Sequence, residues 1–240
     1  MAKHIPHLFV NDNEINSLSL SDDSFHHLIH VLRFKSGYEF IILNNQGLKA
    51  HCIIKEIKKN GLFFEILKTT NNPKSLNSLN LFQAITKVET FEEILDKATQ
   101  LGVSLITPVI TENINTSLDI FNKKYSRFNK ILRSSAEQSQ RIYLPILNNI
   151  ISLQDLYNQN NADNTFIAYE KSTIPLKFTL ENFKGQNINL FCGPEGGFTD
   201  NEAEFLSEKF KTFSLGKNIL RAETAVLSGL SNIIYQLDLF

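Results

Sequence analysis

Residues 190–202 read Leu-Phe-Cys-Gly-Pro-Glu-Gly-Gly-Phe-Thr-Asp-Asn-Glu. The apolar start predicts the end of a buried strand, the glycines predict a tight turn, and the residues from 198 onward predict a helix. Ligands of open α/β sheets bind beyond the carboxyl ends of the strands, and this turn falls at such an end. A tight connection that binds no ligand is the alternative interpretation.

The turn does not match the known phosphate-binding loops. A Walker loop needs Lys and Ser or Thr after its last glycine, whereas Phe198 and Thr199 stand here, and the glycine spacing of the Rossmann fingerprint is also absent. Glu195 inside the turn disfavours a phosphate and favours a ligand that is cationic or carries hydroxyl groups. The absence of a loop lysine therefore argues against a nucleotide-phosphate enzyme.

A second glycine turn follows closer to the C-terminus. Leu215 ends a predicted strand, Gly216 turns the chain, and a predicted helix begins at Ala222. Arg221 and Glu223 stand at the start of this helix, where a carboxylate complements the helix dipole. An exposed capping pair is the alternative, but Arg221 is one of only five arginines in the chain and lysine cannot replace its planar fork.

Strands alternate with helices around both turns, which predicts a mainly parallel α/β sheet with helices on both faces. The predicted strands are 79–85, 105–110, 165–169, 187–192 and 212–215. The predicted helices are 91–101, 123–138, 198–210, with Asp200 as a possible N-cap, and 222–237.

The first part of the chain, to about residue 70, predicts a small β-barrel with one helix. Its predicted strands are 39–43, 49–57 and 62–67, with a turn at 44–47, and its predicted helix is 21–33. Residues 69–78 are polar and contain Pro73, which is typical of a linker.

The charge balance, the apolar segments and the cysteines exclude several classes of protein. The chain of 240 residues carries 24 Lys+Arg against 25 Asp+Glu, so its net charge of −1 excludes a strongly basic coat protein of nucleic acids. No apolar signal segment opens the sequence and no run is long enough to cross a membrane, so we expect a cytoplasmic protein without membrane contact. Cys52 and Cys192 stand singly in apolar segments, which predicts buried thiols and no metal site.

These segments, with two polar helix ends, resemble in order the RsmE-type 16S ribosomal RNA uridine-N3 methyltransferases of the SPOUT superfamily. The motifs that carry the resemblance are Gly193 to Phe198, Leu215-Gly216 with Ile219 to Ala225, Ala136 to Ser139 with Arg141 and Pro145, Lys97 to Val103 with Pro108, and His27 with Val31 to Arg33 and Gly37.

The resemblance implies an N-terminal PUA-like RNA-binding β-barrel over 1–72 and a C-terminal SPOUT methyltransferase domain with a trefoil knot over 73–240. It implies a homodimer that uses S-adenosylmethionine to methylate N3 of a uridine in the decoding region of 16S rRNA. The expected substrate is this rRNA within the small ribosomal subunit. The cofactor-binding residues that it implies are Leu190, Gly193, Pro194, Glu195, Gly196, Leu215, Gly216, Ile219, Leu220 and Arg221.

We assign two catalytic roles on this basis. Arg221 is expected to stabilise the uracil anion that forms when N3 loses its proton, and Glu223 is expected to accept that proton. The residues expected to contact RNA are His27, His30, Arg33, Lys35, Lys87 and Arg141. Arg141 is expected to reach the RNA from the partner subunit.

The chain departs from the family pattern at three places. Gln100 stands where the family often has glutamate, and the N-terminus has His4 and His7 in place of arginines. After Pro108 the family usually shows an arginine near a serine, whereas the run 111–117, which includes Asn113, has none. Two alternatives stay open: methylation of a ribose 2′-hydroxyl or another base, and an RNA-binding ribosome-assembly factor without catalysis.

Overall fold

The computed structural model describes residues 5–180, 183 and 187–237, so His4 lies outside the described residues. By its internal contacts the chain divides into two compact units. The first is Met1–Lys74 with Ala136–Leu144, and the second is Ser75–Ser135 with Pro145–Phe240. Hydrogen bonds attach segment 136–144 to the rest of the first unit. The Phe9 amide donates to Glu137 Oε1 at 3.0 Å, the Tyr143 hydroxyl donates to the carbonyl of Asn72 at 2.6 Å, and the Leu144 amide donates to Asn45 Oδ1 at 2.7 Å.

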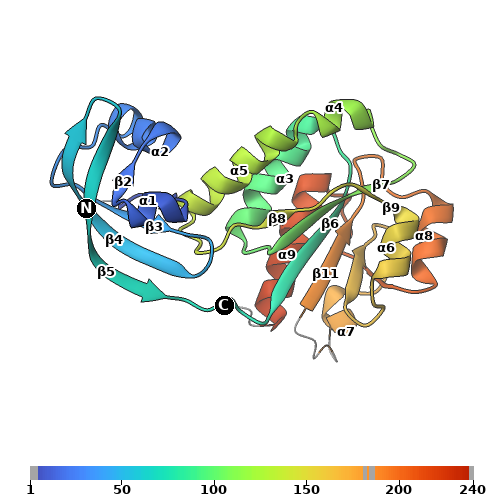
Figure 1. Cartoon of the computed structure of the whole chain (residues 1–240). Helices are drawn as coiled ribbons and strands as arrows, with labels where there is room; N and C mark the ends of the chain where they lie inside the picture. Colours follow the sequence, from blue (N-terminus) through green and yellow to red (C-terminus); the bar gives the residue numbers. More distant parts are fainter. Residues whose placement is uncertain (1–4, 181–182, 184–186, 238–240) are drawn as a thin grey trace. The chain divides into compact units, whose positions relative to one another are not determined.

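The first unit is built on a five-stranded sheet in the order β1-β3-β4-β5-β2, drawn in blue and cyan in Figure 1. All its pairs are antiparallel except β1 with β3. One side of the sheet is buried under an apolar core that includes Leu28, Phe40 and Phe64. Its strands are β1 (His7–Phe9), β2 (Ser19–Leu20), β3 (Glu39–Leu43), β4 (Leu48–Lys58) and β5 (Gly61–Asn71).

The helical part of this unit differs from the prediction. The predicted single helix 21–33 is α2 (Asp22–His26) followed by a π-helical turn, η1 (His27–Val31), in which the Leu32 amide reaches back five residues to the carbonyl of His27 at 2.9 Å. A further helix that the sequence analysis missed, α1 (Asp12–Asn16), starts at a capping box formed by Asn11 and Glu14.

The predicted linker at 69–78 is too long. Strand β5 continues to Asn71 because Thr69, Thr70 and Asn71 pair with Ala50, Lys49 and Leu48 of β4. The next strand already begins at Ser78, so the connection without regular structure is confined to residues 72–77. Propensity alone could not extend β5 because its pairing partners lie about twenty residues earlier.

The second unit contains a seven-stranded, fully parallel sheet in the order β12-β10-β11-β6-β7-β8, with β9 also paired to β7. This confirms the predicted parallel α/β architecture. The strands are β6 (Ser78–Ala84), β7 (Leu105–Ile110), β8 (Ile146–Leu147), β9 (Ile151–Ser152), β10 (Thr165–Ala168), β11 (Asn187–Cys192) and β12 (Lys211–Phe213).

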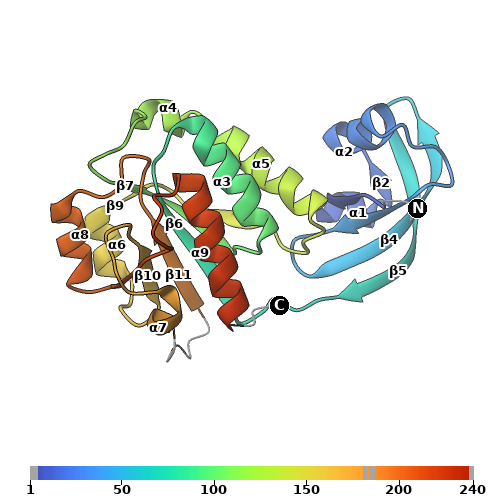
Figure 2. The same cartoon turned by 180° about the vertical axis from the view of Figure 1, so that it is seen from behind.

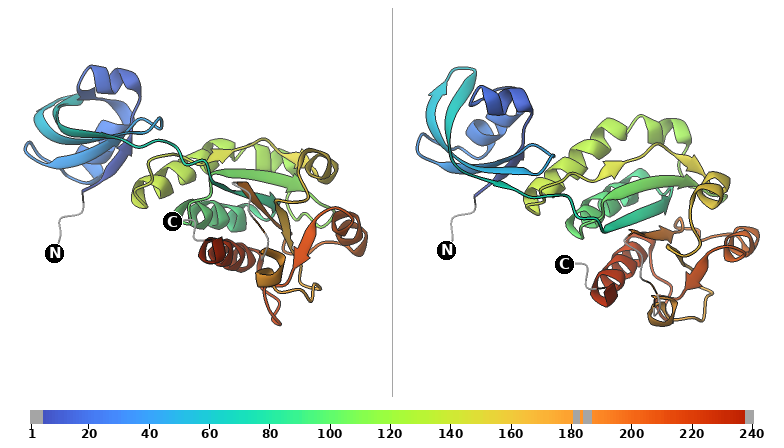
Figure 3. Two further views of the ribbon diagram at one scale, coloured as in Figure 1. Left: turned by 90° about the horizontal axis from the view of Figure 1, so that it is seen from below. Right: turned by 60° about the horizontal axis from the view of Figure 1, so that its bottom comes forward.

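Helices cover both faces of this sheet because its strands are apolar on both sides. Leu81 and Leu190 pack into the core with α3 (Val88–Gln100) and α9 (Ala222–Leu237), whereas their neighbours Phe82 and Phe191 pack with α8 (Asp200–Ser207). Figure 2 and both views of Figure 3 show α3 and α9 side by side. The remaining helices are α4 (Leu118–Asn122), α5 (Tyr125–Gln138), α6 (Leu153–Gln159) and α7 (Leu176–Leu180).

Several short elements of the second unit were missed, namely α4, α6, α7, β8 and β9. Helix α6 had a readable signal, since Ser152 and Asp155 form a capping box. The predicted N-cap at Asp200 is wrong: Thr199 caps α8, with its hydroxyl accepting from the Glu202 amide and the Glu202 carboxylate accepting from the Thr199 amide. Among the described helices, none combines the length and apolarity needed to span a membrane.

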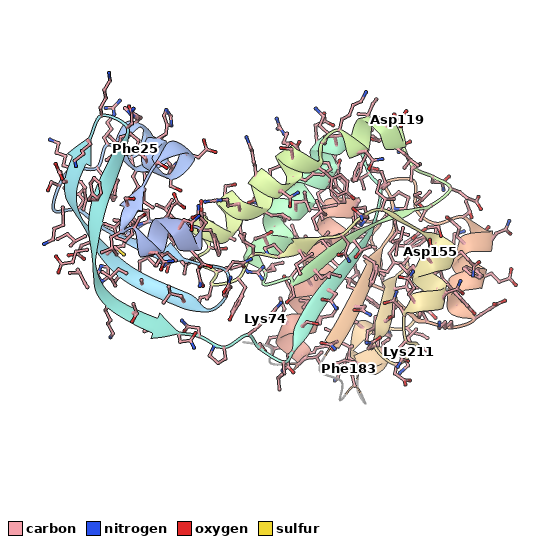
Figure 4. The ribbon with its side chains drawn as sticks, viewed as in Figure 1. Phe25, Lys74, Asp119, Asp155, Phe183 and Lys211 are labelled. Carbon is pink, nitrogen blue, oxygen red and sulfur yellow. The ribbon has the colours of Figure 1, made fainter. Side chains whose placement is uncertain are left out.

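Aromatic rings anchor the helices to the sheet. Phe91 of α3 lies 4.7 Å from Phe121 and 5.1 Å from Phe128 between ring centroids, and all three side chains are fully buried. On the same face Phe183, labelled in Figure 4, contacts Phe166 edge to face at 5.6 Å. These contacts fix the position of α3, whose first residue follows the strand end of β6.

We predict that Phe91→Ala lowers the free energy of unfolding by about 3–5 kcal/mol, because it empties the centre of this aromatic cluster. Urea unfolding followed by near-ultraviolet circular dichroism measures the change. Ile120→Ala is the matched control, since that side chain is 52% exposed and its loss should cost less than about 0.5 kcal/mol. Equal effects of the two substitutions would contradict the assigned core.

Candidate functional site

The glycine turn after β11 is held by its neighbours. The Gly197 amide donates to the carbonyl of Pro194 at 3.0 Å, and the buried side chain of Gln83 on β6 donates to the carbonyl of Gly193 at 3.1 Å. A Cβ on Gly193 would lie 3.1 Å from the ring of Phe198, and Gly197 has a φ of +71°, which side chains other than glycine adopt rarely. The positive φ therefore favours glycine at position 197, and a larger residue at position 193 would have to displace the Phe198 ring.

The loop after β7 also bonds to this turn. The side-chain amide of Asn113 donates to the carbonyl of Gly197 at 3.0 Å and to that of Gly196 at 3.4 Å. One residue earlier, the Glu112 amide donates at 2.8 Å to the buried carboxylate of Glu202 on α8. Since carbonyl oxygens only accept, the Asn113 nitrogen must face them.

Beyond the strand ends lies a cavity of about 270 Å³. It brings together most of the predicted cofactor-binding residues, which come from both glycine turns. These residues are Gly193, Pro194, Glu195, Gly196, Leu215, Gly216, Ile219 and Leu220. The start of α9 closes the cavity with Ala222 and Ala225.

Two predicted cofactor-binding residues do not line this cavity. Leu190 is fully buried within β11, and its side chain packs where a Cβ on Gly229 would come within 2.9 Å of it. Arg221 lines a neighbouring cavity instead. Cys192, two residues later on the same side of β11, does line the cavity, so Leu190 lies too deep in the strand to reach it.

The sequence analysis missed one wall of the cavity, formed by Ala168, Tyr169 and Glu170. Ala168 ends β10 and the other two residues follow it; β10 pairs with β11 although about twenty residues separate the two strands. The same rule about strand ends would have found them if the strand order had been known. A Cβ on Gly197 would stand 3.1 Å from Glu170 Oε1, so the glycine also leaves room for this carboxylate.

The cavity carries negative charge. Glu170 and Glu195 are its charged groups, and no lysine, arginine or histidine occurs among the described residues that line it. Glu195 Oε1 accepts from the Lys87 amide at 3.0 Å, which fixes the carboxylate at the rim. A cationic ligand is therefore favoured over a phosphate.

A second cavity of about 480 Å³ adjoins the first and shares Glu195, Ile219, Leu220 and Ala222 with it. It brings together the predicted catalytic residues Arg221 and Glu223 and the predicted RNA-binding residue Lys87, and Thr90 of α3 completes the lining. Both α3 and α9 begin at this cavity. Cations, carboxylates and two helix starts thus surround one space beside the anionic cavity.

The other predicted RNA-binding residues belong to the first unit. His27, His30, Arg33 and Lys35 are exposed around the π-helical turn, and the His30 ring lies 5.1 Å from that of His26. Arg141 is half-buried in the segment 136–144, and burial lowers the pKa of its guanidinium to about 10, so it remains cationic at neutral pH. Among the described residues no group of three or more His, Cys, Asp or Glu is arranged to hold a metal ion.

Comparisons with known proteins add to this geometry. A family model described as an RNA methyltransferase domain matches residues 72–234, and one described as an RNA methyltransferase PUA domain matches residues 20–67. The chain is 30% identical over 237 residues to the ribosomal RNA small subunit methyltransferase E of Bacillus subtilis, with 94% of this chain and 93% of the relative covered. It is 32% identical over 220 residues to the protein of that name from Rickettsia conorii, covering 89% and 87%.

Solved structures agree over nearly the whole length. A ribosomal RNA small subunit methyltransferase E from Neisseria gonorrhoeae bound to S-adenosyl methionine superimposes with a TM-score of 0.83 at 25% identity, covering 97% of this chain and 98% of that one. A putative methyltransferase from Legionella pneumophila, in complex with the same cofactor, gives a TM-score of 0.84 at 26% identity and the same coverage.

We predict that neither cysteine reacts with a thiol reagent in the folded protein. Cys192 lines the first cavity but is 1% exposed, burial raises the pKa of its thiol, and burial raises the pKa of Cys52 to about 12. Both thiols are therefore protonated and covered at pH 8, and the thiolate is the reacting form. Ellman's reagent should modify no thiol in buffer and both in urea. Fast modification of Cys192 in a Cys52→Ser variant would contradict the closed cavity wall.

Proposed function

The chain belongs to the ribosomal RNA small subunit methyltransferase E family of RNA methyltransferases, and we propose that it methylates N3 of a uridine in the decoding region of 16S rRNA. It is an S-adenosylmethionine-dependent rRNA methyltransferase. The observation that carries the proposed target is the pair of adjoining cavities. An anionic one suits the cofactor, and one lined by Arg221, Glu223 and Lys87 suits a base.

The residues around the first cavity fit S-adenosylmethionine. Gly193, Gly196, Gly197 and Gly216 line it without side chains, so a ligand can approach the backbone closely. Leu215, Ile219 and Leu220 offer apolar contacts, and the carboxylates of Glu170 and Glu195 complement a cation. When bound, the cofactor supplies an electrophilic methyl group on a sulfonium.

The second cavity suits the uracil because it presents both kinds of group that N3 methylation needs. Neutral N3 is a poor nucleophile, so it must lose its proton as the new C–N bond forms. The carboxylate of Glu223 accepts this proton, and the guanidinium of Arg221 stabilises the negative charge that spreads over O2 and O4. Glu195 lines both cavities, which marks their shared wall as the place where methyl group and N3 meet.

Binding of the RNA itself falls to the predicted N-terminal domain over 1–72, whose PUA-domain match covers residues 20–67. His27, His30, Arg33 and Lys35 contact the phosphates of the RNA, and the target base leaves its stack to enter the second cavity.

The active form is a homodimer in the cytoplasm, in which Arg141 contacts RNA from the partner subunit. Ile219 at the cavity rim is 88% exposed and Tyr235 on α9 is 86% exposed, which favours cover by a second copy. The proposed methyltransferase domain over 73–240 contains a trefoil knot.

Transfer of labelled methyl groups tests the target. Purified protein and labelled S-adenosylmethionine are incubated with small subunits that lack the modification, and the RNA is digested to nucleosides. N3-methyluridine is the expected product. A 2′-O-methylated nucleoside or another methylated base would contradict the proposed target atom, and binding of RNA without methyl transfer or cofactor binding would favour an assembly factor.

We predict that Arg221→Ala lowers kcat about 10²–10³-fold, because the anion loses its stabilising charge. The dissociation constant of S-adenosylmethionine, measured by calorimetry, should change less than about threefold since Arg221 does not line the first cavity. Lys217→Ala, which removes an exposed charge four residues away, is the control. Near-normal turnover of Arg221→Ala would remove its assigned role.

We predict that Asn113→Ala weakens S-adenosylmethionine binding about five- to tenfold, because the carbonyls of Gly196 and Gly197 lose their donor. Asn113→Asp should bind poorly at pH 8, where its carboxylate faces two carbonyl oxygens, and should recover at lower pH as the protonated acid donates a hydrogen bond. Calorimetry between pH 5 and 8 measures both variants. The exposed Asn115→Ala is the control, and an Asp variant without pH dependence would contradict the role of this bond.

A further inference from the structure

One segment of the second unit concentrates positive charge that the proposed mechanism does not use. Residues 123–135 contain Lys123, Lys124, Arg127, Lys130 and Arg133 but no aspartate or glutamate, in a chain whose net charge is −1. Two of the five arginines of the chain lie here. Neither cavity is lined by any of these side chains.

The charges gather on one side of α5. Phe128 and Leu132 form its buried face, whereas Lys123 in the preceding turn and Arg127, Lys130 and Arg133 are exposed. On α5 the cations Arg127, Lys130 and Arg133 are three residues apart, which places them along one side of the helix, and Lys123 stands in the turn before it. From Arg127 to Arg133 the helix rises about 9 Å. We call Lys123, Arg127, Lys130 and Arg133 the basic face.

The basic face stands on a fixed support. Phe128 belongs to the buried cluster with Phe91 and Phe121, and the Ser135 hydroxyl donates at 2.8 Å to both the carbonyl and a carboxylate oxygen of Asp96 on α3. A helix anchored in this way presents its outer side chains without rearrangement, which lowers the entropic cost of binding a partner.

The charges of this face are only partly neutralised within the protein. Arg127 pairs with Glu92 of α3 at 2.5 Å, although its own side chain remains 65% exposed. Neither Lys123 nor Lys130 forms an ion pair with a described residue. Lys123 and Lys130 therefore present charge that a polyanion can neutralise.

We propose that the basic face binds the phosphate backbone of the substrate RNA; the inference rests on the proposed function, because it adds a contact surface for that same RNA. The exposed residues beside these cations include Ser126, Asn129 and Ser134, which are polar. They offer hydrogen bonds to phosphate oxygens. A membrane surface is disfavoured because no apolar side chain on this face could insert into it.

The experiment compares two double variants of the whole chain. Lys123→Gln with Lys130→Gln removes two charges from the basic face without breaking an ion pair. The control, Lys177→Gln with Lys211→Gln, removes two exposed charges of the same unit from α7 and β12. Figure 4 labels Lys211, and it labels Asp119 of α4, the helix next to the basic face. RNA affinity is measured by fluorescence anisotropy at several salt concentrations, and S-adenosylmethionine affinity by calorimetry.

The basic-face variant should bind RNA about tenfold more weakly near 100 mM salt, and the slope of log affinity against log salt should fall by roughly 1.4–1.8 for two lost phosphate contacts. Cofactor affinity and the control variant should match the wild type. Equal RNA affinity and slope for both variants would overturn the proposal. The proposal would also be overturned if the basic-face variant methylated naked RNA normally and lost activity only on small subunits, because the basic face would then contact a ribosomal protein. A wild type that binds RNA with the full slope but transfers no methyl group would sink the proposed function alone.

Discussion

The backbone turn at Gly193–Gly197 keeps its shape because side chains from neighbouring strand ends bond to its carbonyls. Gln83 of β6 holds the carbonyl of Gly193, and Asn113 beyond β7 holds those of Gly196 and Gly197. The Glu195 carboxylate is fixed in turn by the backbone before α3. A loop of glycines would otherwise sample many conformations, so these bonds supply the order that a binding site needs.

The parallel sheet makes this arrangement possible. All of its strands end at one edge, so β6, β7, β10, β11 and β12 deliver their following residues to the same region. That edge separates charge into two adjoining spaces. The first cavity has only carboxylates among its described charged groups, whereas Lys87 and Arg221 bring positive charge to the second. This contrast supports the proposal that the first cavity takes the sulfonium and the second takes the uracil, with Glu195 on the wall that they share.

Local sequence signals were enough to predict the elements that build this edge. The two glycine turns, the strand before each and the long helices α3, α5 and α9 could be read from apolar periodicity and turn residues. The features that the sequence did not show depend on distant pairing or on depth along a strand. Glu170 was missed because the pairing of β10 with β11 is not visible in the sequence, and Leu190 lies fully buried two residues before Cys192, the residue of β11 that lines the first cavity. The π-helical turn after α2 likewise follows the same periodic pattern as a regular helix over its few residues.

The most direct test of this account is a calorimetric titration of S-adenosylmethionine into the wild type and into Gly193→Val. The account predicts one cofactor per chain for the wild type. It predicts no measurable binding for the variant, because even the first added carbon would lie 3.1 Å from the Phe198 ring and the branched side chain would displace the turn. A wild type that does not bind, or a folded variant that binds as well as the wild type, would contradict the assignment of the glycine turn as the cofactor site.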